Sequence, residues 1–149
     1  MKILFVCTGN TCRSPMAELI FKDMIKNYSK NINCDSAGLS AVDGMDISKN
    51  ALIALKEIGI DASGKKAKNI SSVEDIEDID LFVAMTVTQA KLLLDFKIPS
   101  ERIYILGGGI PDPYGMDLDE YRMIMGAIKN ALVSLLDELK GKNSGRYVH

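Results

Sequence analysis

Residues 2–18 read KILFVCTGNTCRSPMAE, and this stretch decides the fold. Residues 3–6 form an apolar run typical of a buried strand. Residues 15–26 place apolar side chains at helical spacing, Pro15 suits the first turn of a helix, and Ser14 is expected to cap it. The stretch therefore predicts a strand that ends at Cys7, a tight loop, and a helix from Pro15 to about Lys26.

The rest of the chain continues to alternate strands and helices. Further strands are predicted near residues 32–36, 81–85 and 102–106, and further helices at 48–58, 86–95 and about 117–140. Met116, Met123 and Met125 are interpreted as core residues. Such alternation favours a parallel sheet covered on both faces, so the predicted fold class is α/β, with three α/β/α layers around a four-stranded parallel sheet.

The length and net charge of the chain are those of an ordinary globular protein. With 149 residues, residues 1–149 are expected to form one domain with a loosely ordered tail at 141–149. A net charge of −2 argues against nucleic-acid or anionic-membrane partners. No apolar run approaches the length of a membrane span, and the N-terminus does not resemble a signal peptide. A cytoplasmic monomer is expected.

The chain has three cysteines and one histidine, His149 at the very end. An odd cysteine count without a CxxC pair argues against a disulfide scaffold, a zinc site and an iron–sulfur site. No metal and no cofactor are therefore expected. If Cys7 is a nucleophile, a group other than histidine has to activate it.

The loop after the first strand has the composition of an anion site. Gly9 and Asn10 tolerate left-handed backbone angles, so the amide N–H groups can converge where the helix N-terminus also points. This positive field is expected to lower the pKa of the Cys7 thiol. Arg13 can hold two phosphoryl oxygens, and Ser14 can donate a hydrogen bond to the sulfur. The predicted phosphate-binding residues are Thr8, Gly9, Asn10, Thr11, Cys12, Arg13 and Ser14.

Other interpretations of this loop have less support. It is not a nucleotide-binding loop, because the GxxxxGK[ST] pattern is absent. A buried Cys7 that ends a strand and a surface Arg13 in a polar turn would leave the Gly, Asn and Thr between them without explanation. The spacing therefore favours phosphoryl transfer with Cys7 as the nucleophile.

A general acid is predicted from residues 110–115, which read IPDPYG. Asp112 lies between two prolines, which restrict its backbone on both sides, and it follows a strand that ends at the same sheet edge as Cys7. It could protonate the leaving atom and then activate a water. Taken alone, Asp-Pro is more typical of a plain turn. The catalytic interpretation depends on its pairing with the Cys7 loop.

These motifs resemble the low-molecular-weight protein phosphatase family. The resemblance covers residues 1 to about 140 and rests on CTGNTCRS at 7–14, SAG at 36–38, DLFVAMT at 80–86 and DPYG at 112–115. It implies a four-stranded parallel sheet and a metal-independent phosphocysteine mechanism on phosphorylated proteins. Residue by residue, the resemblance assigns the nucleophile to Cys7, the phosphate-binding arginine to Arg13, the general acid to Asp112, loop support to Asn10, Ser14 and Ser36, and a reversible disulfide with Cys7 to Cys12.

The resemblance includes arginine-directed and tyrosine-directed phosphatases. Thr11 offers a polar wall suited to a guanidinium, whereas tyrosine-directed members often have an aliphatic residue there. Gly115 stands where tyrosine-directed members often carry a second aromatic after Tyr114. Thr11 and Tyr114 are therefore predicted to set substrate choice, and phosphoarginine is favoured over phosphotyrosine. The chain departs from the family at residues 62–66, ASGKK, where a histidine is often found.

Two further classes remain as alternatives. Arsenate reductases of this fold relay oxidation through later cysteines, and this chain has none after Cys34. A non-catalytic phosphate-binding module would need neither Cys7 nor Asp112.

Overall fold

The computed structural model describes residues 1–28 and 31–141. Four strands form one parallel sheet: β1 (Lys2–Cys7), β2 (Asn33–Gly38), β3 (Leu81–Ala84) and β4 (Ile103–Ile105). Their order across the sheet is β2-β1-β3-β4. At the carboxyl end of β1, Cys7 pairs in register with Gly38 of β2. The predicted α/β class with a four-stranded parallel sheet is confirmed.

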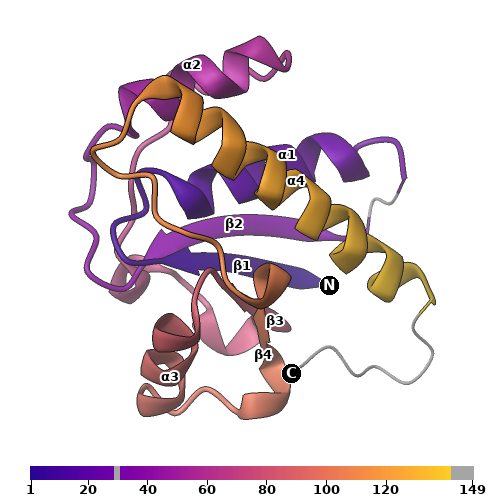
Figure 1. The fold of residues 1–149 in the computed structure, drawn as a ribbon. Helices are drawn as coiled ribbons and strands as arrows, with labels where there is room; N and C mark the ends of the chain where they lie inside the picture. The colour runs from indigo at the N-terminus through magenta and orange to yellow at the C-terminus, as the bar shows by residue number, and fades with distance from the viewer. Residues whose placement is uncertain (29–30, 142–149) are drawn as a thin grey trace.

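Helices cover both faces of this sheet (Figure 1). α1 (Arg13–Ile25), α2 (Lys49–Glu57) and α4 (Leu118–Gly141) lie on one face, and α3 (Val87–Asp95) lies on the other. Side chains alternate along a strand, so Ile3 and Phe5 join the core under α1 and α4, while Leu4 and Val6 join the core under α3. Because both faces are buried, β1 is a continuous apolar run.

Side-chain caps begin α2 and α3 but not α1. Ser48 accepts a hydrogen bond from the Ala51 N–H at the start of α2, and Thr86 accepts one from the Gln89 N–H at the start of α3. The predicted Ser14 cap of α1 is wrong: the helix begins at Arg13, and Cys12 precedes it without a side-chain cap. The predicted tail at 141–149 lies outside the described residues, apart from Gly141, which ends α4.

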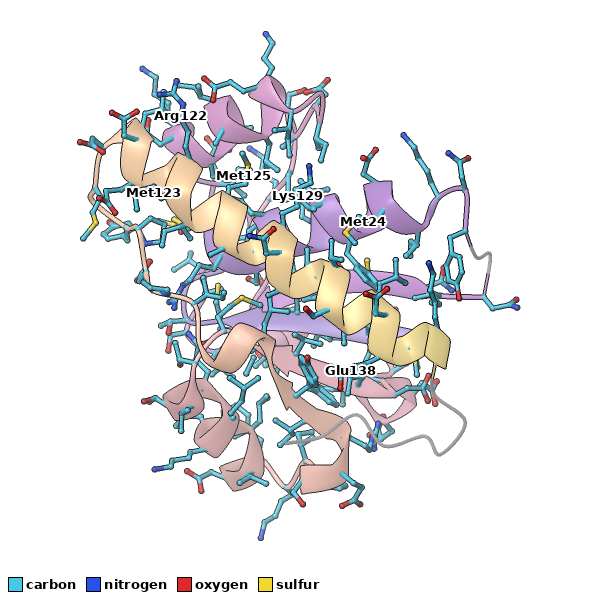
Figure 2. The ribbon with its side chains drawn as sticks, turned by 45° about the vertical axis from the view of Figure 1, so that its right-hand side comes forward. Met24, Arg122, Met123, Met125, Lys129 and Glu138 are labelled. Atoms are coloured by element: carbon cyan, nitrogen blue, oxygen red, sulfur yellow. The ribbon has the colours of Figure 1, made fainter. Side chains whose placement is uncertain are left out.

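The long helix α4 joins the other helices of its layer (Figure 2). Arg122 donates Nε–H to Glu57 Oε1 at 2.9 Å and Nη2–H to Glu57 Oε2 at 2.7 Å, which ties α4 to α2. Of the three methionines interpreted as core residues, only Met125 is buried. Met116, in the segment before α4, is about half exposed, and Met123, on the outer side of α4, is about two-thirds exposed.

The topology places one crevice at the carboxyl ends of the strands. The chain leaves β1 toward the α1 face and leaves the adjacent strand β3 toward the α3 face. In open parallel sheets, ligands bind where successive connections diverge in this way. Cys7 lies at that point.

Candidate active site

The loop between β1 and α1 is held by backbone hydrogen bonds from two neighbouring segments. Its backbone carbonyls accept hydrogen bonds from the N–H groups of Leu39 and Ser40, at 2.9 Å each, and of Ser48, at 2.8 Å. Asn10 alone in the loop adopts a left-handed backbone, with φ of +55°. The expectation of such angles is therefore met at Asn10 and not at Gly9.

Cys7 is buried at the base of this loop. Its Sγ lies 2.8 Å from Ser14 Oγ and 3.3 Å from the backbone nitrogen of Asn10, which donates to it. Burial raises the pKa of the Cys7 thiol, while the hydrogen bonds from Ser14 and Asn10 and the charge of Arg13 act in the opposite direction. The predicted fall in the pKa of Cys7 is wrong, because the loss of hydration outweighs these stabilising groups.

Arg13 and Asp112 meet above the loop. Arg13 is buried, donates Nη1–H to the Ile110 carbonyl at 2.9 Å, and brings Nη2 to 3.5 Å from Asp112 Oδ2. Asp112 is half exposed, and its Oδ1 accepts a hydrogen bond from the Tyr114 N–H at 3.1 Å. The loop after β4 thus brings the predicted acid to the predicted phosphate-binding arginine, 99 positions earlier in the chain.

These groups surround a cleft of about 290 Å³. Thr8, Gly9, Thr11 and Cys12 line it together with Cys7, Asn10, Arg13 and Asp112. Tyr114 stands at its rim and is three-quarters exposed, beside the exposed apolar side chains of Val42 and Met45. The cleft therefore has a polar, hydrogen-bonding base and a more apolar mouth.

The predicted loop-supporting residues lie in one hydrogen-bonded group. Asn10 Nδ2 donates to Ser14 Oγ at 2.7 Å and to Ser36 Oγ at 3.0 Å, and Asn10 Oδ1 accepts from the Lys68 N–H at 2.9 Å. Asn10 therefore links the loop to β2 and to the segment before residue 70.

Two buried residues of this region were not predicted from the sequence. Glu18 is fully buried one helical turn after Ser14, and its Oε1 accepts a hydrogen bond from Ser36 Oγ at 2.6 Å. Gln89 Nε2 donates to Thr8 Oγ1 at 3.2 Å. Each had a usable signal: Glu18 is a charged residue on the apolar face of a helix, and Gln89 follows Thr86 at the spacing of a capping box.

Cys12 lies where the loop meets α4. It is buried, and its Sγ lies 3.1 Å from the hydroxyl of Tyr121 in α4. Burial and the neighbouring Cys12 raise the pKa of Tyr121 to about 12, so the hydroxyl is neutral near pH 7. Cys7, Cys12 and Cys34 are all free thiols.

Two features are absent from the described part of the chain. Within residues 1–28 and 31–141, no three His, Cys, Asp or Glu side chains are grouped so that they could hold a metal ion. None of the helices in these ranges is both long and apolar enough to span a membrane.

A buried cysteine whose sulfur accepts the Asn10 N–H, with an arginine and a carboxylate in the same cleft, has the features expected of a cysteine-based phosphate site on an α/β sheet. The comparisons with known proteins agree: the profile described as "Low molecular weight phosphotyrosine protein phosphatase" matches residues 2–145. The chain belongs to the low-molecular-weight cysteine-based phosphatase family, and the resemblance predicted from its motifs is confirmed.

The relatives include proteins named as arginine phosphatases and proteins named as tyrosine phosphatases. A protein-arginine-phosphatase of Bacillus subtilis is 34% identical, with 94% of this chain and 97% of that protein covered. A low-molecular-weight protein-tyrosine-phosphatase, PtpB, of Staphylococcus haemolyticus is 38% identical, with 82% and 88% covered. A solved structure described as "YwlE arginine phosphatase - C7S mutant with phosphorylated active site serine" matches with a TM-score of 0.88 at 30% identity, covering 98% of this chain and 100% of that one.

Proposed function

We propose that this chain is a metal-independent protein phosphatase that forms a phosphocysteine on Cys7 and acts on phosphoarginine. The observation that carries the proposal is that Cys7 Sγ, which accepts the Asn10 N–H, lines the same cleft as Arg13 and Asp112, whose side chains are 3.5 Å apart. The related structure with a phosphorylated active-site serine supports covalent transfer to the residue at the nucleophile position.

In the first step, the phosphoryl oxygens bind to the loop N–H groups and to the Arg13 guanidinium. The Cys7 sulfur attacks phosphorus as the thiolate, with Ser14 Oγ–H and the Asn10 N–H donating to it. The new S–P bond replaces the bond to the leaving nitrogen or oxygen. Asp112 gives its proton to that leaving atom, so that the group does not depart as an anion.

In the second step, Asp112 acts in the opposite sense. Its carboxylate takes a proton from a water that attacks the phosphorus of the phosphocysteine, and the S–P bond breaks. The electron pair returns to Cys7 sulfur, where the hydrogen bond from Ser14 favours its departure. The products are inorganic phosphate and the free enzyme.

The preference for phosphoarginine rests on the cleft wall. Thr11 lines the cleft and offers a hydroxyl to a guanidinium, and Gly115 leaves Tyr114 as the aromatic residue at the rim. The arginine-phosphatase relative of Bacillus subtilis, which aligns over nearly the whole of both chains, supports this choice. The tyrosine-phosphatase relative with higher identity over a shorter alignment makes phosphotyrosine the second candidate.

The test compares turnover of a phosphoarginine protein and a phosphotyrosine peptide, with Cys7→Ser as the blank and Thr11→Ile as the variant. Thr88→Ile is the matched control, because Thr88 is exposed on α3, away from the cleft. Phosphoarginine should be preferred, and Thr11→Ile but not Thr88→Ile should reduce the preference. Preference for phosphotyrosine, or a Thr11→Ile variant that behaves as wild type, would contradict the assignment.

We also propose that residues 1–149 act as one domain on phosphorylated proteins, and that Cys12 is the redox partner of Cys7. The two cysteines border the same short loop and both line the cleft. A disulfide between them would remove the nucleophile reversibly.

A further inference from the structure

The carboxyl group of Asp112 reaches the cleft from a half-exposed turn. Its Oδ1 accepts the Tyr114 N–H at 3.1 Å, and its Oδ2 lies 3.5 Å from Arg13 Nη2. A general acid has to lie within hydrogen-bond reach of the atom that it protonates. The position of this carboxyl group therefore depends on how the backbone of residues 110–116, here called the acid turn, is held.

The acid turn is compact. The Met116 N–H donates to the Pro113 carbonyl at 2.9 Å, which closes a β-turn. Gly115 takes a positive φ of +77° inside it, as glycine readily does in such turns. Because the turn moves as one unit, a contact at its end also fixes the position of Asp112.

Both ends of the acid turn are anchored to the rest of the protein. At the first end, the Ile110 N–H donates to the Met85 carbonyl at 2.7 Å, and the Ile110 carbonyl accepts from Arg13. At the second end, the Met116 carbonyl accepts a hydrogen bond from Asn50 Nδ2 at 3.2 Å. Asn50 is partly exposed and comes from a segment 66 positions earlier in the chain.

The first turn of α2 thus contacts both sides of the cleft. Ser48, which caps α2, donates its backbone N–H at 2.8 Å to the carbonyl of Thr11, a residue that lines the cleft. Asn50 follows in the same helical turn and donates to Met116. The bidentate ion pair between α2 and α4 keeps the helix in place against the segment that follows the acid turn. α2 therefore bridges the loop after β1 and the acid turn.

We propose that Asn50 is a positioning residue for Asp112: its side-chain amide fixes the Met116 carbonyl and so holds the turn that brings the Asp112 carboxyl group to the leaving atom. This inference rests on the proposed acid role of Asp112. Asn50 does not line the cleft, so it acts through the turn and not on the substrate. A hydrogen bond of this kind changes an equilibrium roughly two- to tenfold, which sets the size of the expected effect.

The first test uses two aryl phosphates that differ in their leaving group. Phenyl phosphate releases a poor leaving group that needs a proton, and p-nitrophenyl phosphate releases one that does not. Asn50→Leu should lower kcat/KM about three- to tenfold on phenyl phosphate and by less than about twofold on p-nitrophenyl phosphate. Asn130→Leu is the matched control, because Asn130 is exposed in the middle of α4 and does not line the cleft; it should change neither value.

Equal losses of kcat/KM on the two aryl phosphates, or no loss on phenyl phosphate, would overturn the positioning role. A general loosening of the fold would slow both reactions alike, so the difference between the two substrates is the diagnostic quantity.

A second variant separates positioning from helix stability. Asn50→Asp keeps the shape of the side chain but cannot donate to the Met116 carbonyl. An acidic residue in the first turn of α2 interacts favourably with the helix dipole, so this variant should be at least as stable as wild type. It should still lose kcat/KM on phenyl phosphate to the same extent as Asn50→Leu. Wild-type kcat/KM in Asn50→Asp would show that the donated hydrogen bond does not hold the turn.

The third measurement needs no turnover. Amide hydrogen exchange, followed by NMR, should become about two- to tenfold faster at Tyr114 and Met116 in Asn50→Leu and stay unchanged in Asn130→Leu. Unchanged exchange in Asn50→Leu would refute the anchoring, even if no phosphorylated substrate is hydrolysed.

Asp112→Asn separates this inference from the proposed function. If Asp112→Asn loses the same kcat/KM on both aryl phosphates, the acid role fails, and the positioning role that rests on it fails too. If Asp112→Asn distinguishes the two substrates and Asn50→Leu does not, the positioning role alone is refuted. In the Asp112→Asn background, Asn50→Leu should have no further effect that depends on the leaving group, because the two changes act on one proton transfer.

Discussion

The loop between β1 and α1 packs so closely on β2 that Gly38 is predicted to tolerate no side chain. A Cβ at Gly38 would lie 2.6 Å from the Thr8 carbonyl oxygen, 2.9 Å from the Asn10 nitrogen and 2.8 Å from Ala41 Cβ. Two of these atoms belong to the loop backbone and cannot rotate away. An ordinary carbon–oxygen contact is about 3.3 Å, so Gly38→Ala must displace the loop by roughly 0.7 Å.

This displacement should affect stability and catalysis together. Forcing one methyl group into a packed site costs about 1–3 kcal/mol of unfolding free energy. A misplacement of about 1 Å at a reacting group costs roughly 100-fold in rate, so a shift of this size should lower kcat by about 10- to 100-fold. Urea unfolding and single-substrate kinetics on the same preparation measure both quantities.

Gly126→Ala is the matched control. Gly126 is exposed in α4, and a Cβ there meets nothing within 4 Å. It should leave kcat unchanged and stabilise the protein by up to about 1 kcal/mol, because alanine is the better helix former. Wild-type kcat and stability in Gly38→Ala would refute the argument. A loss of stability without a loss of kcat would show that the strain is relieved away from the loop.

Three further predictions concern the acid, Asp35 and the thiols. Asp112→Asn should lower kcat/KM, which reports the first step, about 100- to 10,000-fold on a substrate with a poor leaving group and much less on p-nitrophenyl phosphate, whose leaving group needs no proton; equal losses of kcat/KM on both would exclude the acid role. Burial raises the pKa of Asp35, but the hydrogen bonds from Lys68 and from the Ser36 N–H, together with the charges of Lys68 and Lys65, outweigh it and the pKa is lowered overall. Its carboxylate therefore contributes stability above the unfolded pKa of about 3.9, which is lost as the pH falls through the lower folded value. When the pH is lowered from neutral to below about 4, the urea midpoint should fall less in Asp35→Asn than in wild type. Identical falls in the two proteins would contradict this prediction. Mild peroxide should remove two of the three free thiols and leave a disulfide between Cys7 and Cys12; three persistent thiols would contradict the redox pairing.

Much of the fold is predictable because its signals are local. The apolar run of β1, Ser48 before α2 and Thr86 before α3 act through neighbours in the sequence, so periodicity and capping locate these elements to within a residue or two. Ser14 misled the prediction because its hydroxyl is used by Cys7 and Asn10 and not by the helix end.

The site is predictable in its motif but not in its environment. Cys7, Arg13 and Asp112 stand out because strand ends and turn residues mark them. The pKa of Cys7 depends on how deeply the sulfur is buried, which no local pattern reveals. The contacts of Glu18 with Lys65 and Ser36 join three segments across the fold, so only the assembled structure brings them together.

The central claim is that phosphoryl transfer passes through the sulfur of Cys7. The most direct test is rapid acid quenching of the enzyme during turnover, followed by mass spectrometry of the peptide that contains Cys7, with Cys7→Ala as the control. The account predicts a phosphoryl group on Cys7 that appears before steady-state phosphate release and is absent together with turnover in Cys7→Ala. With p-nitrophenyl phosphate, whose leaving group needs no proton, it should accumulate further in Asp112→Asn. Turnover by Cys7→Ala, or phosphate release with no phosphorylated Cys7 at any quench time, would contradict it.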